Sequence, residues 1–311
     1  MLWKRRSKAK TGWAVVDAAQ DGFAFVHGIF GGTGRPRIER FALLPRNAED
    51  AGLAHAAREL GLGKYPCATL LRPQDYHMLL VEAPRVPRQE WKTAARWLVK
   101  EMLDFDVEQA ALEVLDIPAP KDTPGRPLQM FAVAARKDVL ADCINRYTEA
   151  AVPLTVIDVP ETAQRNLSAL YDEGGRATGL AYFDDHGGLF TITCGGELYM
   201  SRRIEIGMSE LLGGSEDTRA DARDRILLEL QRSLDHFERQ YNELPLARVV
   251  IGPEPKESGL VRHLASNLAL PVSPIDLAQV VDLPTGGIEP ALQWRLFHLI
   301  GAAFRHETAP N

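Results

Sequence analysis

Two antiparallel hairpins, one opening each half of the chain, constrain the fold more than any other feature of this sequence. In the first half, the apolar run 13–16 is followed by a turn at 18–22 and a second apolar run at 23–26. In the second half, residues 180–183 lead through an acidic, glycine-bearing turn into residues 189–193. Short apolar runs on either side of a turn predict paired strands. With 311 residues, the chain is long enough for two coupled lobes, one built on each hairpin.

Helices and further strands are predicted after each hairpin. Residues 88–102, 218–241 and 291–304 have the apolar spacing of helices. The apolar stripe predicted for the first of these helices consists of Trp91, Ala94, Ala95, Leu98, Val99 and Met102. Trp97 lies off that stripe, and we interpret it as covering a shoulder of the helix, with an exposed contact residue as the alternative. The alternation of strands and helices predicts an α/β arrangement of layers.

Charge, hydropathy and cysteine content exclude several classes of protein. The formal net charge of −6 and a pI near 5.8 argue against nucleic acid as the main partner. No stretch approaches the ~20 apolar residues that a transmembrane segment needs. Three widely spaced cysteines, Cys67, Cys143 and Cys194, suit a reducing cytoplasm. We therefore predict a cytoplasmic protein whose basic start, residues 1–10, is either a solvated terminus or a weak peripheral membrane contact.

Side chains for metal binding or nucleophilic catalysis form no recognisable motif. The eight histidines show no paired spacing of the kind that binds zinc, and no Gly-x-Ser-x-Gly elbow is present. His186 lies in the acidic turn of the second hairpin, where we interpret it as an exposed turn residue rather than an anion contact. We predict no catalytic residue.

The turns of the two hairpins resemble the nucleotide site of the actin, Hsp70 and sugar-kinase superfamily, whose fold is ribonuclease H-like. In such a site two turns face each other across a cleft, their N–H groups hold phosphates, and nearby aspartates orient Mg²⁺. Asp185, Gly187 and Thr191 have the spacing Asp-x-Gly-x-x-x-Thr of the second phosphate turn. The resemblance thus places nucleotide binding at Asp17, Asp185, Gly187, Thr191 and Gly252, and Mg²⁺ at Asp17 and Asp185.

Other positions depart from that pattern. Ala19 stands where the first turn has glycine, and the two residues after it replace small hydroxyl residues. Pro253, which has no N–H, follows Gly252 where a second glycine is usual. Asp21 and Asp184 add negative charge, and a like-charge contact at 4 Å costs about 1 kcal/mol in water and about 4 kcal/mol at an effective dielectric of 20. We predict a one-sided cleft that binds ATP and Mg²⁺ weakly or not at all, without hydrolysis; an active ATPase or kinase is the alternative.

Several segments, in order along the chain, resemble the PilM group of pilus-biogenesis proteins, and within it the MshI type of mannose-sensitive haemagglutinin (MSHA) pili. They are residues 8–10, 13–17, 80–84, 97–105, 185–187, 230–238 and 299–305. The most specific is 230–238, which is similar to the helix motif Glu-x-Gln-Arg-Ser-Leu-x-x-Tyr/Phe of that group.

The resemblance implies an actin-like scaffold of a type IV pilus machine, held at the inner membrane through its partners. Such proteins bind the cytoplasmic tail of a PilN-like inner-membrane protein, in a groove between an inserted subdomain and the first lobe. The assembly ATPase and self-association are further expected contacts, and no motif fixes the groove residues. The cytoplasmic half of a GspL-like secretion protein is a close alternative.

The predicted division of the chain follows from the resemblance. It comprises a basic flexible leader at 1–12, a first lobe at 13–175 with the inserted α/β subdomain at about 68–155, a second lobe at 176–290, a C-terminal helix at 291–305 that packs back on the first lobe, and a flexible tail at 306–311.

Overall fold

The computed structural model describes residues 12–18, 22–30, 34–45, 52–118, 127–172 and 174–305. The predicted tail, nearly all of the predicted leader, and the first hairpin turn with Ala19 and Asp21 lie outside these residues. No helix within the described ranges is long and apolar enough to cross a membrane.

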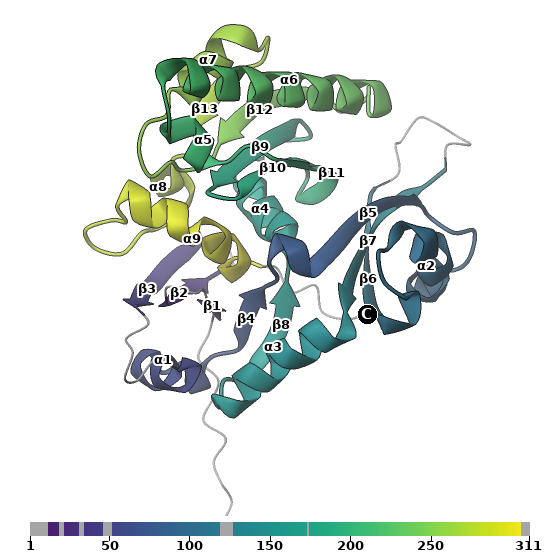
Figure 1. The fold of residues 1–311 in the computed structure, drawn as a ribbon, viewed down its shortest axis with the longest axis vertical. Helices are drawn as coiled ribbons and strands as arrows, with labels where there is room; N and C mark the ends of the chain where they lie inside the picture. The colour runs from purple at the N-terminus through teal and green to yellow at the C-terminus, as the bar shows by residue number, and fades with distance from the viewer. Residues whose placement is uncertain are drawn as a thin grey trace, which may run out of the picture.

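A five-stranded sheet forms the base of the first lobe (Figure 1). Its strands lie in the order β3 (Arg37–Pro45), β2 (Gly22–Ile29), β1 (Trp13–Ala18), β4 (Cys67–Leu70) and β8 (Leu154–Asp158). The first three strands are antiparallel, and β1, β4 and β8 are parallel. The central strand β1 is buried along most of its length, which explains the apolar run at 13–16 that opens it.

A second five-stranded sheet repeats the same arrangement in the second lobe. Its strands are, in order, β11 (Glu197–Ile204), β10 (Gly187–Cys194), β9 (Ala177–Asp184), β12 (Leu246–Ile251) and β13 (Val272–Pro274). Here too three antiparallel strands are followed by two parallel ones. Both predicted hairpins are confirmed, since Val15 pairs with Val26 and Tyr182 pairs with Leu189.

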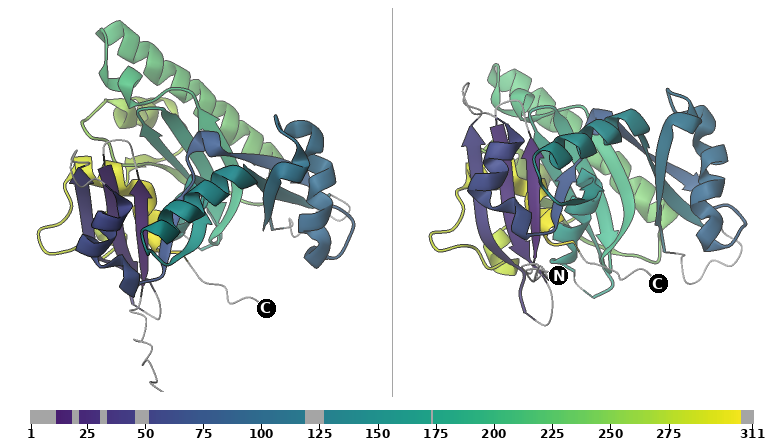
Figure 2. Two further views of the ribbon diagram at one scale, coloured as in Figure 1. Left: turned by 60° about the horizontal axis from the view of Figure 1, so that its bottom comes forward. Right: turned by 90° about the horizontal axis from the view of Figure 1, so that it is seen from below.

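A separate three-stranded antiparallel sheet is inserted between β4 and β8. Its strands are, in order, β5 (Tyr76–Glu82), β7 (Gln129–Arg136) and β6 (Ala110–Asp116). The helix α2 (Trp91–Val99) covers one face of this sheet. This inserted sheet lies on the opposite side of the molecule from β1–β3 (Figure 2).

The single helix predicted at 88–102 is an α-helix between two 3-10 turns, η3 (Arg88–Glu90) and η4 (Lys100–Met102). The predicted stripe is only partly right. Trp91, Ala95 and Val99 are buried against the sheet, but Leu98 and Met102 are 41% and 47% exposed. The interpretation of Trp97 as a covered shoulder residue is wrong, because that side chain is 79% exposed. The residues that face the sheet are four apart, and the α-helical spacing ends before Met102, which lies in the 3-10 turn η4.

The other helices cover the two large sheets. They are α1 (Leu53–Leu60), α3 (Lys137–Glu149), α4 (Pro160–Ala169), α5 (Met208–Leu212), α6 (Glu216–Gln240), α7 (Leu260–Asn267), α8 (Leu277–Val280) and α9 (Pro290–Ala303), with 3-10 turns η1 (Leu62–Lys64), η2 (Pro73–Asp75) and η5 (Val107–Gln109). The helices predicted at 218–241 and 291–304 correspond to α6 and α9.

The joint between the two lobes is formed by α4 and α9. A single apolar cluster contains Val15 and Val26 of the first sheet, Leu180 of the second sheet and residues of both helices. The rings of Tyr182 and Phe297 stack 4.7 Å apart within it. At Gly301 a Cβ atom would lie 2.2 Å from the carbonyl oxygen of Ala163, so α4 and α9 are in backbone contact. The joint is closed by dense packing.

Candidate functional site

The turn between β9 and β10 is the predicted second phosphate turn. The backbone N–H of His186 donates to Asp184 Oδ1 at 2.7 Å, so this turn amide is held by a neighbouring carboxylate. Gly187 has φ +147°, and a Cβ there would lie 2.7 Å from the carbonyl oxygen of Ile204. The glycine is therefore required by the close approach of β11, whether or not a phosphate binds. Ser209 of α5 donates to the carbonyl oxygen of Asp185 at 3.3 Å.

Thr191, predicted to contact nucleotide, lies inside the second lobe. Its side chain is fully buried, and its hydroxyl oxygen accepts a hydrogen bond from Gln164 Nε2 at 3.1 Å. The same amide group of Gln164 donates to the carbonyl oxygen of Leu180 at 2.5 Å, and its oxygen lies 3.1 Å from His298 Nε2. Burial lowers the pKa of His298 to about 3. This polar cluster is part of the α4–β10–α9 packing.

Asp17 and Asp185, the predicted Mg²⁺ carboxylates, lie in different surroundings. Asp17 is half-buried near the end of β1 and pairs with Ala24 in the ladder. The pKa of Tyr147 is raised chiefly by burial and, to a smaller extent, by the negative charge of Asp17. The Tyr147 hydroxyl donates to the carbonyl oxygen of Val16 at 2.8 Å. Asp185 lies instead near Tyr182. Burial raises the pKa of Tyr182, and the negative charges of Asp184 and Asp185 raise it further.

The predicted adenine turn at Gly252 and Pro253 ends β12. The Gly252 N–H donates to the carbonyl oxygen of Ala181 at 2.7 Å, and a Cβ on Gly252 would lie 2.9 Å from Tyr182 Cδ2. Beyond this turn, between the start of α6 and α7, lies a polar pocket of about 630 Å³. It is about three times as large as the apolar pocket between β5 and β11 described below.

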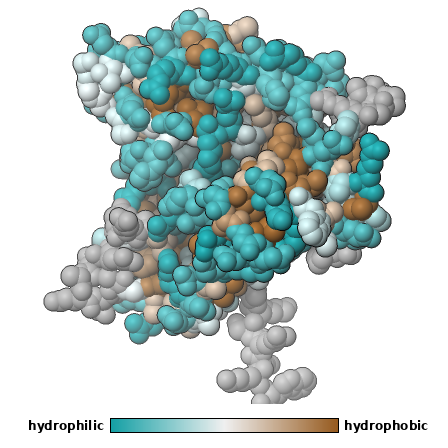
Figure 3. All heavy atoms as spheres, turned by 45° about the vertical axis from the view of Figure 1, so that its right-hand side comes forward, coloured by the Kyte–Doolittle hydropathy of each residue, from teal (hydrophilic) through white to brown (hydrophobic). Residues whose placement is uncertain are grey.

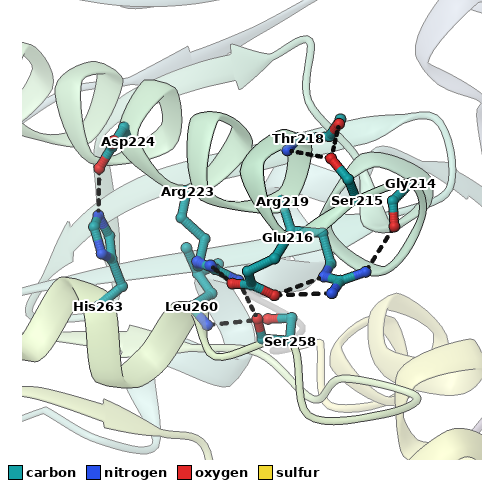
Figure 4. A network of polar contacts seen from close by, with 10 residues as sticks. All are labelled: Gly214, Ser215, Glu216, Thr218, Arg219, Arg223, Asp224, Ser258, Leu260 and His263. Carbon is teal, nitrogen blue, oxygen red and sulfur yellow. Dashed lines mark hydrogen bonds and ion pairs between the residues drawn. The ribbon is translucent and has the colours of Figure 1, made fainter.

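Two arginines of this polar pocket are bound by the carboxylate of Glu216 (Figure 4), and Lys256 also lines it. Glu216 binds Arg219 at 2.8 Å and also Arg223, and these hydrogen bonds lower the pKa of the Glu216 carboxyl. Arg223 Nη1 also donates to the carbonyl oxygen of Ser258 at 3.1 Å. His263 Nε2 lies 3.0 Å from Asp224 Oδ1. An anionic ligand entering here would have to compete with carboxylates for the arginines.

Several groups of this region that could contact a phosphate are already engaged within the described residues. The turn amide of His186 is already bonded to Asp184, the hydroxyl of Thr191 is buried, and Arg219 and Arg223 are held by Glu216. The departures at Ala19 and Asp21 lie in a turn outside the described residues.

An apolar seam joins the inserted sheet to the first lobe. Its buried members are Leu71, Tyr76, Ala135 and Val159, and its partly buried members are Met78, Val133, Leu140 and Ile157. On α3, Ile144 follows Leu140 by one turn and is 48% exposed. Figure 3 shows a band of hydrophobic residues on this side of the molecule, beside the inserted sheet.

A second, smaller pocket of about 210 Å³ lies between β5 and β11. Met78 and Leu80 line it from β5, Tyr199 from β11 and Phe237 from α6. Its lining is mainly apolar, in contrast to the pocket beyond β12. Met78 also belongs to the seam, so seam and pocket are continuous along β5.

A buried polar knot fixes the base of β5 to both lobes. The Tyr76 hydroxyl donates to Glu161 of α4, and Arg203 of β11 binds the same carboxylate at 2.8 Å. The Arg203 guanidinium lies 5.3 Å from the centre of the Tyr76 ring. Glu161 is only 1% exposed, and burial raises the pKa of Tyr76. The sequence analysis missed these residues; a glutamate beginning an otherwise buried helix was the available signal.

The two large sheets share one strand order, third-second-first-fourth-fifth, with the same change from antiparallel to parallel. This duplication around a shared helical joint decides the fold. The chain has the actin-like fold. The predicted ribonuclease H-like architecture with an inserted α/β subdomain in the first lobe is confirmed.

Comparisons with known proteins agree with the actin-like fold. No family model and no curated protein matches the sequence. A chain of the PilM–PilN type IV pilus biogenesis complex is similar in structure, with a TM-score of 0.71 over 96% of this chain and 98% of that chain at 18% identity. More distant are the cytoplasmic domain of EpsL of Vibrio cholerae (TM-score 0.43, 14% identity, 66% and 76% covered) and a Bacteroides thetaiotaomicron protein of unknown function (0.48, 11%, 93% and 97%).

Proposed function

We propose that this protein is a cytoplasmic actin-like scaffold of a type IV pilus assembly machine, which binds the cytoplasmic tail of a PilN-like inner-membrane protein. The observation that carries the proposal is the likeness to a chain of the PilM–PilN complex over almost the full length of both chains. The seven sequence segments that resemble the PilM group support the same assignment. The finer assignment to the MshI type of MSHA pili rests on those segments.

We place the tail against the apolar seam between the inserted sheet and the first lobe. A contiguous patch of exposed apolar side chains is typical of a protein–protein contact. Val133 on β7, and Leu140 and Ile144 on α3, present such a surface. Binding there would hold the protein at the inner membrane through its partner. Contacts with the assembly ATPase and between copies of the chain belong to the same proposal.

We also propose that the nucleotide site is degenerate and that the protein does not hydrolyse ATP. The paired arginines of the polar pocket and the buried hydroxyl of Thr191 support this. The alternative is an ATPase or kinase, which the actin-like fold alone would allow because a fold does not determine an activity. The test is phosphate release from ATP by the purified protein in the presence of Mg²⁺. Steady release that is lost in Asp17→Ala would favour the alternative.

The binding proposal is tested with a labelled synthetic peptide of the cytoplasmic tail of the PilN-like protein from the same genome. Fluorescence anisotropy should show saturable binding to the purified chain. Ile144→Asp places a charge on α3 one turn from Leu140 of the seam and should weaken binding at least tenfold. Leu228→Asp, at a position on α6 that is 45% exposed and lies outside the seam, is the control and should bind like the wild type. No saturable binding of the tail by the wild-type chain would overturn the proposed function.

A further inference from the structure

We infer that the bound tail extends the inserted sheet as an added strand along the outer edge of β5, with alternate apolar side chains in the pocket between β5 and β11. The inference rests on the proposed function and states how, and against which second surface, the partner binds. It brings the second lobe into the binding site, because β11 and α6 form the far wall of the pocket.

The edge of β5 has the backbone geometry for such pairing. The strand lies at one end of the inserted sheet and pairs with β7 alone among the described strands. The N–H of Ala83 donates to the carbonyl oxygen of Leu128 at 2.7 Å, which sets the phase of this antiparallel ladder. Since N–H and C=O groups alternate in direction along a strand, those of Met78, Leu80 and Glu82 point away from β7. An extended peptide lying about 4.8 Å away could pair with them.

The side chains beside that edge select an apolar occupant. The side chains of Met78 and Leu80, whose backbone groups point outward, also line the pocket, and Leu80 is 40% exposed. A volume of about 210 Å³ suits a few aliphatic side chains rather than a folded domain. Residues two apart on an added strand would point into it together, because strand side chains alternate between faces.

Charge further limits the occupant. Among the described residues that line the pocket none is acidic, and Arg202 is already paired with Glu229 at 2.6 Å. The carboxylate beside the pocket, Glu229, is engaged by Arg202 and Arg232, so the desolvation of a lysine or arginine inserted there would go uncompensated. The stretch of the tail that enters the pocket is therefore extended, apolar and free of basic residues.

The width of the pocket is set by the polar knot at its base. Tyr76 begins β5 and Arg203 lies near the end of β11, and both bind the carboxylate of Glu161. The two strands that face the pocket are thus held together at this end, and Gln129 of β7 is bonded to Gln240 and Tyr241 beyond the other end. The pocket exists before the peptide arrives, which reduces the entropy that binding must overcome.

Hydrogen exchange of the full chain with the tail peptide tests strand addition. On binding, the outward amides of Met78, Leu80 and Glu82 should become protected at least tenfold. The amides of β6, at the opposite edge of the same sheet, are the internal control and should not change. Saturable binding without selective protection of β5 would overturn this inference and leave the proposed function standing.

A filling variant gives an independent test. Ser201 lines the pocket from β11, and Ser201→Trp should weaken binding of the tail at least tenfold by occupying the space. Leu228→Trp adds an exposed aromatic ring to α6 outside the pocket and should bind like the wild type. Peptides methylated at one backbone nitrogen each should bind more weakly when that nitrogen faces β5. Such nitrogens occur at every second position of an added strand. Unchanged affinity for Ser201→Trp, or losses without that alternation, would contradict strand addition beside β11.

Discussion

The two joints of this molecule are built differently. Between the lobes, α4 and α9 meet in backbone contact at Gly301, inside one apolar cluster that draws residues from both large sheets. Between the inserted sheet and the second lobe, the contact combines the polar knot, an apolar cluster that includes Ile117 and Phe131, and a pocket of about 210 Å³. The first joint has no room for another molecule, whereas the second leaves backbone and apolar groups uncovered. We therefore expect partners at the second joint and stability from the first.

The largest effect is expected at the closed joint. Gly301→Ala would place a methyl group 2.2 Å from the carbonyl oxygen of Ala163, so α4 and α9 would have to separate. We expect a loss of about 3 kcal/mol in the free energy of unfolding, the upper end for overpacking a core. Urea denaturation measures it. The control is Gly63→Ala, where nothing lies within 4 Å of the new methyl group and little change is expected. Equal stability of both variants would show that the lobes are not packed through this contact.

At the open joint, Arg203→Met removes the cation that binds the buried carboxylate of Glu161. Removing one partner of a fully buried pair costs 3–5 kcal/mol, and because Arg203 is itself 39% exposed we expect a smaller loss of about 2 kcal/mol. The neighbouring variant Arg202→Met breaks a surface pair with Glu229 and should cost less than about 1 kcal/mol. Chemical denaturation of both proteins compares them. A smaller loss for Arg203→Met than for Arg202→Met would mean that the knot does not hold β5 to β11.

The closed joint should also respond to pH through His298. Burial lowers its pKa to about 3, so between about pH 6.5 and pH 3 the unfolded chain binds a proton that the folded chain does not. Stability therefore falls as the pH falls through this range, by about 1.4 kcal/mol per pH unit from this group. From pH 7 to pH 5 the wild type should lose about 2 kcal/mol more than His298→Gln. Parallel slopes for the two proteins in urea titrations would refute this assignment.

The smallest effect is expected at the polar pocket beyond β12. At 1 mM, ATP with Mg²⁺ should raise the Tm of the wild type by less than about 1 °C, because a ligand stabilises only in proportion to its occupancy. Glu216→Gln frees Arg219 and Arg223 from their carboxylate partner and should raise the affinity for ATP several-fold. Glu238→Gln, elsewhere on α6, is the control. A large shift for the wild type would instead indicate an intact nucleotide site.

Local patterns were enough to predict the hairpins and the long helices. The apolar runs of the two hairpins and the apolar spacing of α6 involve only residues that are near one another in the sequence. Their strand and helix periods could therefore be recognised without the structure. The same reasoning failed for Leu98 and Met102, because their burial depends on how the helix packs on the sheet and where it ends, which local sequence does not reveal.

The candidate sites were less accessible to prediction. Thr191 matches a phosphate-turn spacing, but the same spacing carries the chain into the buried part of β10, where Gln164 binds its hydroxyl. Tyr76, Glu161 and Arg203 meet across separations of 85 and 42 residues, which no local pattern connects. The edge of β5 follows from strand order, a property of the folded sheet rather than of the apolar run.

The close contact of α4 and α9 has a mechanical consequence. Opening the lobes would pull Tyr182 away from Phe297 and expose the shared cluster to water, so the body resists bending between its halves. The knot adds a stiff link from the inserted sheet to β11, and β11 packs beside α6, a rod of about 37 Å at 1.5 Å per residue. A force applied to β5 by a bound partner would thus be transmitted to the second lobe with little deformation of the elements between them.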